Sequence, residues 1–172
     1  MKKITKTGKR GLELIKSFEG LYLKPYLCPA GVPTIGYGST FYEDGTKVTL
    51  KDKPINEARA VALLQFELAM SEKYVDAYCQ DDITQNQFDA LVSFVYNAGP
   101  AALKASTLLV KVNKNPNDPT IREEFLKWVK ADGTHNGIDD DGDGQIDEVG
   151  EKQTLKGLIK RRGSEADLYF SK

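Results

Sequence analysis

Apolar residues recur every three positions near the start of the chain, at Leu12, Ile15 and Phe18. This spacing predicts a short amphipathic helix that begins after Thr7 and runs to about Glu19. The Thr7 hydroxyl can accept hydrogen bonds from the free backbone donors of the first turn, and Gly20 is a natural end for the helix.

A longer helical pattern follows Pro54 and Asn56, two residue types that commonly open a helix. It covers residues 57 to about 79, and its apolar positions are three, four and seven residues apart, at Val61, Leu64, Leu68 and Val75. A helix of this length can link two lobes of one domain.

A capping-box pattern opens the next helix, because Thr84 lies three residues before Gln87. The following stretch, 88–97, is strongly apolar and is predicted to lie in the core, and Gly99 and Pro100 end it. Further helices are predicted at about 105–112, 120–131 and 155–170.

Residues 21–50 have a different pattern, in which short runs rich in Tyr, Thr, Val and Ile are interrupted by prolines and glycines. This pattern predicts a small antiparallel sheet. We therefore expect residues 1–172 to form a single, mostly helical α+β domain. Its sheet lobe covers about 20–52, its helical lobe about 80–172 together with the N-terminal helix, and an acidic insert occupies about 132–152.

Composition narrows the class of protein. Hydrophobic residues make up 40% of the chain and charged residues 28%, and no apolar run approaches the roughly 18 residues of a membrane span. The N-terminus also lacks the apolar stretch of a signal peptide. Two cysteines, Cys28 and Cys79, are too few for a disulfide scaffold, so we expect both to stay reduced.

The formal net charge of −1 hides an asymmetry between the insert and the rest of the chain. Residues 139–151 contain seven acidic residues and no basic one, so the other 159 residues carry 24 bases against 18 acids, a net of +6. A basic body suits a polyanion such as nucleic acid or an anionic cell-wall polymer, although scattered solvating lysines give the same balance.

Three polar residues with catalytic chemistry are spaced so that they can converge. Eight residues separate Glu19 from Cys28, five separate Cys28 from Thr34, and the turn around Gly31 can fold the second stretch back. The negative end of a helix disfavours a charged carboxylate, so Glu19 is a candidate proton donor.

Residues 11–38 resemble the phage-type lysozymes, glycoside hydrolase family 24. The family signature is a Glu, eight residues, Asp or Cys, five residues and Thr, followed by Ile-Gly-x-Gly, and this chain matches it with the Cys option. The resemblance spans almost the whole chain outside 132–152, and it resumes at residues 83–99, 106–109, 125–128 and 157–162.

The resemblance implies a lysozyme-like fold with a cleft between the sheet lobe and the helical lobe. It also implies hydrolysis of the β-1,4 bond between N-acetylmuramic acid and N-acetylglucosamine in peptidoglycan. Glu19 would be the general acid and Thr34 would orient the attacking water. Cys28 takes the place of an Asp that can act as a base in relatives, and a neutral thiol fills that role poorly. The alternative is that Cys28 is a small buried apolar residue without a catalytic role.

The same resemblance implies a set of substrate-binding residues, which are Tyr37, Tyr96, Asn97 and Arg162. Tyr96 can instead pack in the core. The adjacent residues Arg161 and Arg162 can form an ion pair with Glu19, bind the anionic glycan or form a solvated helix face. The chain departs from the family at Ser39, where relatives commonly have His, so a contact that shapes the cleft is absent or replaced.

The acidic insert alternates oxygen ligands around a glycine, a spacing that can wrap Ca²⁺. The candidate ligands are Asp139, Asp141, Asp143, Gln145 and Glu148. A solvated acidic loop is the alternative. Any Ca²⁺ would be structural, and we expect no cofactor for catalysis.

Two other functions stay open on the sequence. A lytic transglycosylase also relies on one acidic residue, and an inactive calcium-bound glycan-binding module would fit the missing carboxylate. For the leading hypothesis we expect a monomer that binds peptidoglycan glycan strands, binds no nucleic acid and does not insert into membranes. It would be made in the host cytoplasm and reach the wall, in the periplasm, through a separate membrane-permeabilising protein.

Overall fold

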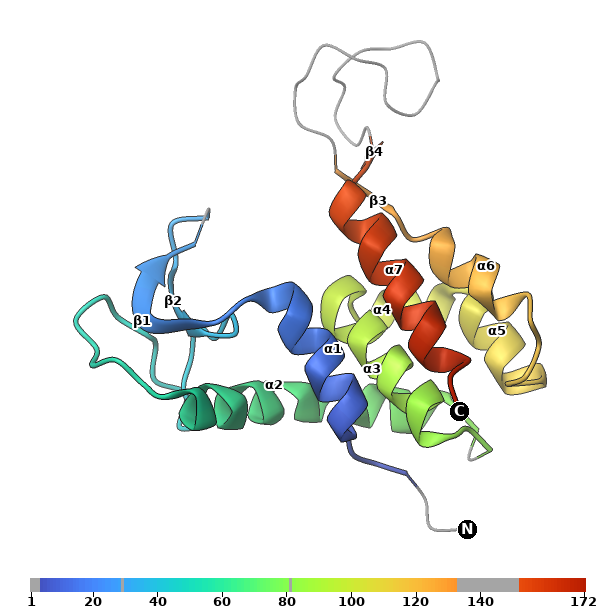
Figure 1. Cartoon of the computed structure of the whole chain (residues 1–172), viewed down its shortest axis with the longest axis horizontal. Coiled ribbons are helices and arrows are strands. Elements are labelled where there is room, and N and C mark those ends of the chain that lie inside the picture. The colour runs from blue at the N-terminus through green and yellow to red at the C-terminus, as the bar shows by residue number, and fades with distance from the viewer. Residues whose placement is uncertain (1–3, 29, 81, 133–151) are drawn as a thin grey trace.

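The computed structural model describes residues 4–28, 30–80, 82–132 and 152–172. Within these ranges it contains seven helices and two small antiparallel sheets (Figure 1). The helices are α1 (Lys9–Glu19), α2 (Glu57–Tyr78), α3 (Gln85–Ala98), α4 (Pro100–Ala105), α5 (Thr107–Lys114), α6 (Ile121–Leu126) and α7 (Lys156–Tyr169). The strands are β1 (Tyr22–Leu27), β2 (Pro33–Gly36), β3 (Lys130–Asp132) and β4 (Lys152–Thr154).

Helix α3 lies at the centre of the helical lobe, where it packs against α1, α2, α4 and α7. Every residue from Gln87 to Val95 is buried, so the helix is covered on all sides, as its unbroken apolar pattern predicts. The predicted capping box is confirmed: Thr84 accepts from the Gln87 backbone, and the Gln87 side chain accepts from the Thr84 backbone N–H at 2.8 Å.

Helix α2 begins below the sheet lobe and runs under the helical lobe, so it connects the two (Figure 1). The side chain of Asn56 caps its first turn, as expected. A small second core of Ile35, Val48 and Leu63 joins the sheet lobe to this helix. Gly36 has a φ of 67°, and a Cβ there would lie 3.4 Å from the Cβ of Ala60, so glycine permits both the bend and the close approach.

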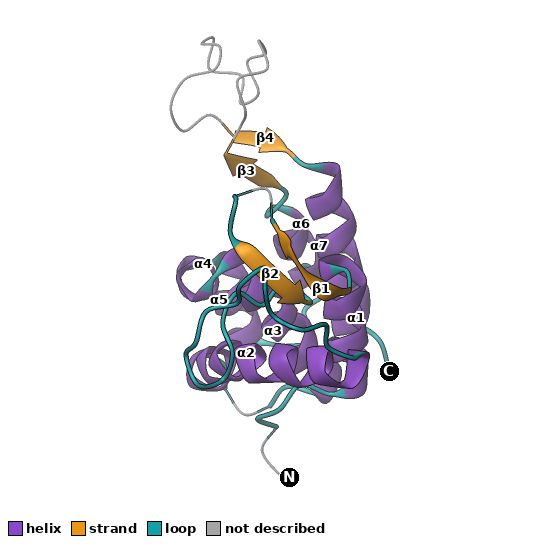
Figure 2. Ribbon diagram, turned by 90° about the vertical axis from the view of Figure 1, so that its left-hand side faces the viewer, coloured by secondary structure: helices purple, strands orange, loops and turns teal. Residues whose placement is uncertain are grey.

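The predicted antiparallel sheet is present as β1 and β2, which pair with Tyr26 opposite Thr34 and Leu27 opposite Pro33 (Figure 2). The register is irregular between Tyr22 and Tyr26. Beyond β2 the lobe consists mainly of turns joined by isolated bridges. The sheet is therefore smaller than the 21–50 pattern suggests, because turn residues interrupt it too often for longer strands.

Three details differ from the sequence expectations. Gly8, with no side-chain cap, opens α1 in place of Thr7. Pro100 begins the short helix α4, which the sequence pattern missed, because proline is favourable in a first helical turn. The helix expected at 120–131 ends at Leu126. The strands β3 and β4, which flank the insert in the sequence, pair with each other (Figure 2).

Among the described helices, none combines the length and the apolar character that a bilayer crossing requires.

Candidate active site

Glu19 is the last residue of α1, and Gly20, with a φ of 73°, ends the helix directly after it. The Glu19 side chain is 24% exposed. One of its oxygens, Oε1, accepts a hydrogen bond at 2.7 Å from Nη1 of Arg161 on α7. The carboxyl group is therefore held in one place while part of it stays accessible to a ligand.

Arg161 is itself fixed from several sides. Its Nε donates to Oε1 of Glu165 at 3.3 Å, and its guanidinium lies 5.4 Å from the centre of the Phe18 ring. Glu165 is fully buried and also accepts from the Ser93 hydroxyl at 2.7 Å. This buried acid balances part of the positive charge of the arginines, which would otherwise be costly to bury.

Cys28 and Thr34 both lie at the turn end of the β1–β2 hairpin, where the Cys28 backbone N–H donates to the backbone oxygen of Val32 at 3.0 Å. The Thr34 hydroxyl donates to the backbone oxygen of Val32 at 2.9 Å. Hydrogen bonds from the Val32 backbone lower the pKa of the Cys28 thiol most, with further lowering by Ala30 and the Thr34 hydroxyl, against an opposing effect of burial. The site therefore favours the thiolate more than an isolated cysteine does. Cys28 forms no disulfide, and neither does Cys79.

Tyr26 joins the two sides of the site, and the sequence analysis missed it. Burial raises the pKa of its phenol most, and the charges of Tyr22, Cys28 and Glu19 add to the rise. Tyr26 thus lies within electrostatic range of both Glu19 and Cys28 and opposite Thr34 in the sheet. Tyr26 is therefore the residue of β1 that links Thr34, by register, with the charges of Glu19 and Cys28, and the hairpin register is the signal that could have identified it.

Tyr96 on α3 is also near Glu19, together with a second carboxyl group that the sequence analysis missed. The Tyr96 hydroxyl donates to Oε2 of Glu67 on α2 at 3.0 Å. Burial raises the pKa of both groups, and the charge of Glu19 adds to each rise. The only sequence signal for Glu67 is its position next to the buried Leu68.

Tyr37 and Arg162 do not fit the direct substrate contacts expected of them. Tyr37 is 3% exposed, packs in the main core and donates to Oε1 of Glu57 at 3.4 Å. Arg162 is 1% exposed and donates to Glu165 at 2.5 Å and to the backbone oxygen of Trp128 at 3.1 Å. Both side chains are covered, so neither is exposed for direct contact with a substrate in this structure.

Asn97 is exposed at the end of α3, and its Oδ1 accepts a hydrogen bond from Nη2 of Arg162. This contact occupies the acceptor side of the amide. The Nδ2 of Asn97 is then the end of the amide that can donate to a ligand.

The expected calcium ligands Asp139, Asp141, Asp143, Gln145 and Glu148 lie outside the described residues. Within the described ranges, no three His, Cys, Asp or Glu residues are grouped closely enough to hold a metal ion.

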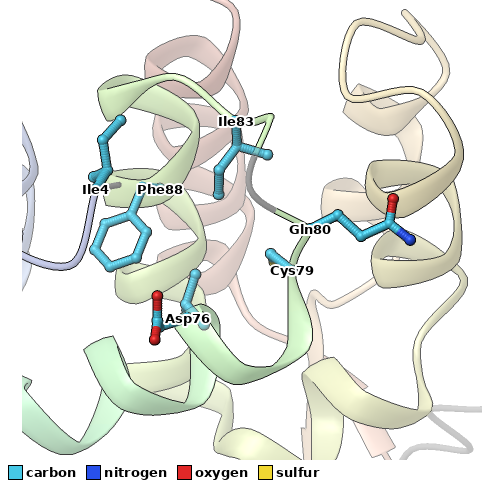
Figure 3. Close-up of a pocket in the computed structure, with 7 residues that line it drawn as sticks. Ile4, Asp76, Cys79, Gln80, Ile83 and Phe88 are labelled. Carbon is cyan, nitrogen blue, oxygen red and sulfur yellow. The ribbon is translucent and has the colours of Figure 1, made fainter. Parts of the chain in front are cut away.

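A small pocket beside the end of α2 is separate from these residues (Figure 3). Its volume is about 10 Å³, which is room for one water molecule and not for a sugar ring. Its lining includes Asp76, Cys79 and Phe88 and none of the candidate site residues.

Comparison with known proteins gives a consistent result. Residues 16–165 match the family model described as phage lysozyme. The chain is 36% identical over 164 residues to the endolysin of Acyrthosiphon pisum secondary endosymbiont phage 1, covering 95% of this chain and 97% of that protein. It is 37% identical to the endolysin of Bacillus phage B103, covering 94% of this chain and 52% of that protein, so it spans about half of that relative.

A solved structure, the endolysin from Escherichia coli O157:H7 phage FAHEc1, superposes with a TM-score of 0.76 at 35% identity, covering 96% of this chain and 94% of that one. The expected lysozyme-like fold, mostly helical with a small antiparallel sheet, is thereby confirmed. On the family match and these similarities, the chain belongs to the phage lysozyme family, the enzymes that hydrolyse bacterial cell-wall peptidoglycan.

Proposed function

We propose that the enzyme cleaves the β-1,4 bond between N-acetylmuramic acid and N-acetylglucosamine, with Glu19 as the general acid. The observation that carries this proposal is the position of the Glu19 carboxyl group, which is partly exposed and fixed by the 2.7 Å contact with Arg161. A positioned acid beside the glycosidic oxygen protonates the leaving group as the bond to the anomeric carbon breaks.

Thr34 is proposed to orient the attacking water. When its hydroxyl hydrogen is donated to the Val32 carbonyl, the lone pairs of Oγ1 are left as acceptors. A water that donates one hydrogen to Oγ1 can direct an oxygen lone pair at the anomeric carbon. The proton that this water loses needs an acceptor close by.

Cys28 is proposed to supply that acceptor, or the negative charge that stabilises the oxocarbenium-like transition state. The lowered pKa of its thiol supports this role, because a larger thiolate fraction is present near neutral pH than for an ordinary cysteine. We expect Cys28→Ala to lower kcat about tenfold or more and Cys28→Asp to retain activity. Equal rates for Cys28→Ala and the parent would remove Cys28 from the mechanism.

The decisive test of the proposed function is Glu19→Gln, which keeps the shape of the side chain and removes the transferable proton. The release of reducing ends from purified peptidoglycan should fall at least about 100-fold with little change in Tm. Glu13→Gln is the matched control, because Glu13 lies on the same helix, is exposed and carries the same charge. Activity of Glu19→Gln equal to that control would refute the proposal.

Product analysis of the parent enzyme separates hydrolysis from the transglycosylase alternative. A reducing N-acetylmuramic acid end is the expected product, and a 1,6-anhydro end would establish the other reaction. Loss of wall clearance in Glu19→Gln also distinguishes an enzyme from an inactive glycan-binding module.

Two further proposals concern the environment of the enzyme. We propose that a separate membrane-permeabilising protein gives a monomeric enzyme access to the wall from the host cytoplasm. Co-expression with and without such a protein would test this by culture lysis.

We also propose that residues 139–148 bind a structural Ca²⁺, because acidic residues at this density repel one another without a cation. Calcium should then raise Tm and leave kcat unchanged, and identical melting curves with calcium and with chelator would refute it.

A further inference from the structure

Two tyrosine rings are stacked on β1, shortly after the candidate acid in the chain. The ring centroids of Tyr22 and Tyr26 are 4.1 Å apart, and the interplanar angle is 28°. In a regular strand, residues four positions apart are separated by about 13 Å, which is too far for rings that stand perpendicular to the sheet to stack. A local distortion of β1 therefore brings the two rings together.

The register of the hairpin shows this distortion. Tyr22 is opposite Gly36 and Tyr26 is opposite Thr34, so β1 takes four steps where β2 takes two. Pro25 lies within this extra length, where the missing N–H of a proline is tolerated. A bulge of this kind bends the strand and redirects its side chains, and bulges are over-represented next to active sites.

The stacked pair lies beside the candidate active site. A Cβ on Gly20 would lie 3.7 Å from Cε2 of Tyr22, so the Tyr22 ring lies against the residue that directly follows Glu19. The second ring, that of Tyr26, belongs to the residue opposite Thr34 in the sheet. The pair therefore extends from the end of α1, where the acid is placed, toward the strand that carries Thr34 (Figure 1).

The two rings differ in exposure. Tyr22 is 49% exposed, whereas Tyr26 is partly buried. Tyr26 thus supports one face of the Tyr22 ring, while part of that ring stays open to a ligand. A ring that is already held in one orientation loses less conformational entropy when a ligand binds.

An exposed aromatic ring in this position suits a sugar. A pyranose with equatorial substituents presents a face of C–H groups, and the face of an aromatic ring carries partial negative charge, so the two faces attract one another. Contact between them also removes apolar surface from water. The glycan strand of peptidoglycan is a chain of such pyranoses.

We propose that Tyr22, held against Tyr26, is a substrate-binding residue on which a pyranose ring of the glycan strand packs next to the cleaved bond. The proposal rests on the proposed function, because it requires the strand to lie beside Glu19. Tyr22 contributes binding, and it takes no part in proton transfer.

The test compares Tyr22→Leu with Tyr22→Phe on purified peptidoglycan. Leucine keeps an apolar side chain without an aromatic face, whereas phenylalanine keeps the ring. From initial rates of reducing-end release, KM should rise about three- to tenfold in Tyr22→Leu, while kcat stays within about twofold of the parent. Tyr22→Phe should keep both KM and kcat within about twofold.

Co-sedimentation with insoluble peptidoglycan measures the same contact without turnover. Each Tyr22 change is combined with Glu19→Gln, so that the strand is bound and not cleaved. The apparent Kd should rise about three- to tenfold with Tyr22→Leu and stay within about twofold with Tyr22→Phe. Failure of the proposed function is a separate observation, because Glu19→Gln alone would then release reducing ends as fast as the parent.

Two further variants address non-specific adhesion and loss of stability. Phe66→Ala removes a ring of similar exposure, 51%, from α2 and should change neither KM nor the apparent Kd. Tyr22→Gln replaces the ring with a polar side chain suited to an exposed position. It carries the same test if Tyr22→Leu lowers Tm too far for assay.

Four outcomes would overturn the proposal. KM and the apparent Kd could be unchanged in Tyr22→Leu. Tyr22→Phe could lose as much binding as Tyr22→Leu, which would assign the effect to the hydroxyl group and not to the ring. Phe66→Ala could weaken binding equally, which indicates general adhesion of exposed aromatic residues. Tyr22→Leu could also lower kcat with KM unchanged, which indicates that Tyr22 only supports the end of α1.

Discussion

The two ends of helix α1 are held by opposite arrangements of charge. At the amino-terminal end, the helix presents backbone N–H groups and other helices supply the carboxylates. Asp89 of α3 accepts from Gly8 at 2.8 Å and from Gly11 at 3.0 Å, and Glu72 of α2 accepts from the Thr7 backbone at 2.8 Å. At the other end, the helix itself carries the carboxylate Glu19, and α7 supplies a cation.

The two ends of α1 therefore have different roles: the amino-terminal end anchors the helix, and the carboxy-terminal end carries the candidate catalytic acid. The acids at the amino-terminal end are buried, satisfy donors that a helix leaves unpaired and are not available to a ligand. Glu19 is partly exposed, and its direct partner among the described residues is Arg161, so it can exchange that contact for one with a substrate. Because α1 is a single rigid element, the anchor at one end fixes the position of the acid at the other.

The largest effect on stability is expected at the catalytic end, from Glu165→Gln. This change leaves Arg161 and Arg162 buried with one less compensating charge, so the free energy of unfolding should fall by about 3 to 5 kcal/mol. Urea denaturation measures it. Asp167→Asn, at an exposed residue of the same helix that pairs with Arg122, is the control and should cost less than about 1 kcal/mol. Equal losses of unfolding free energy in the two variants would show that the buried charge network contributes no more to stability than an exposed ion pair.

At the anchoring end, Asp89→Ala should be the most damaging change. It removes the acceptor for two backbone donors and for the Gln85 amide, and we expect a loss of about 2 to 4 kcal/mol. Asp89→Asn retains one oxygen and should lose less. Native-state hydrogen exchange should show the earliest loss of protection in α1. Uniform loss across all helices would contradict the local anchoring role.

Gly11→Ala tests how closely the anchor approaches the helix. A Cβ at this position would lie 2.6 Å from both Cβ and Cγ of Asp89, so the two elements must separate, at a cost of about 1 to 3 kcal/mol. The matched change is Gly163→Ala in α7, where no atom lies within 4 Å of the new Cβ. There alanine should raise stability by about 0.5 to 1 kcal/mol, because it reduces the freedom of the unfolded chain. Thermal unfolding gives both values, and a change of the same sign in the two variants would contradict the close approach as the cause.

The smallest effect is expected from Lys6→Ala. Lys6 pairs with Glu72 at 2.8 Å, but its side chain is 75% exposed, so solvent screens the pair. The loss should stay below about 0.5 kcal/mol and shrink further at high salt. A larger loss would mean that the anchor depends on this ion pair and not on the buried backbone contacts.

Local patterns predicted much of the fold and part of the site. The end of α1 at Glu19, the Asn56 cap and the Thr84–Gln87 capping box follow from neighbouring residues, and the structure confirms them. Thr7 was wrong as the cap of α1, because the capping acid comes from Asp89, 81 residues away from Gly8. The contact partner of Glu19 is more distant still, since Arg161 is 142 residues away.

The sequence by itself determined the spacing of Glu19, Cys28 and Thr34 and the apolar faces that form the helices, because both depend on residues near one another in the chain. Only the tertiary structure decided which distant charges face Glu19 and that Tyr37 and Arg162 are covered. The physical reason is that burial and electrostatic coupling depend on distance in space. Packing α2, α3 and α7 around α1 sets those distances, and no local pattern encodes them.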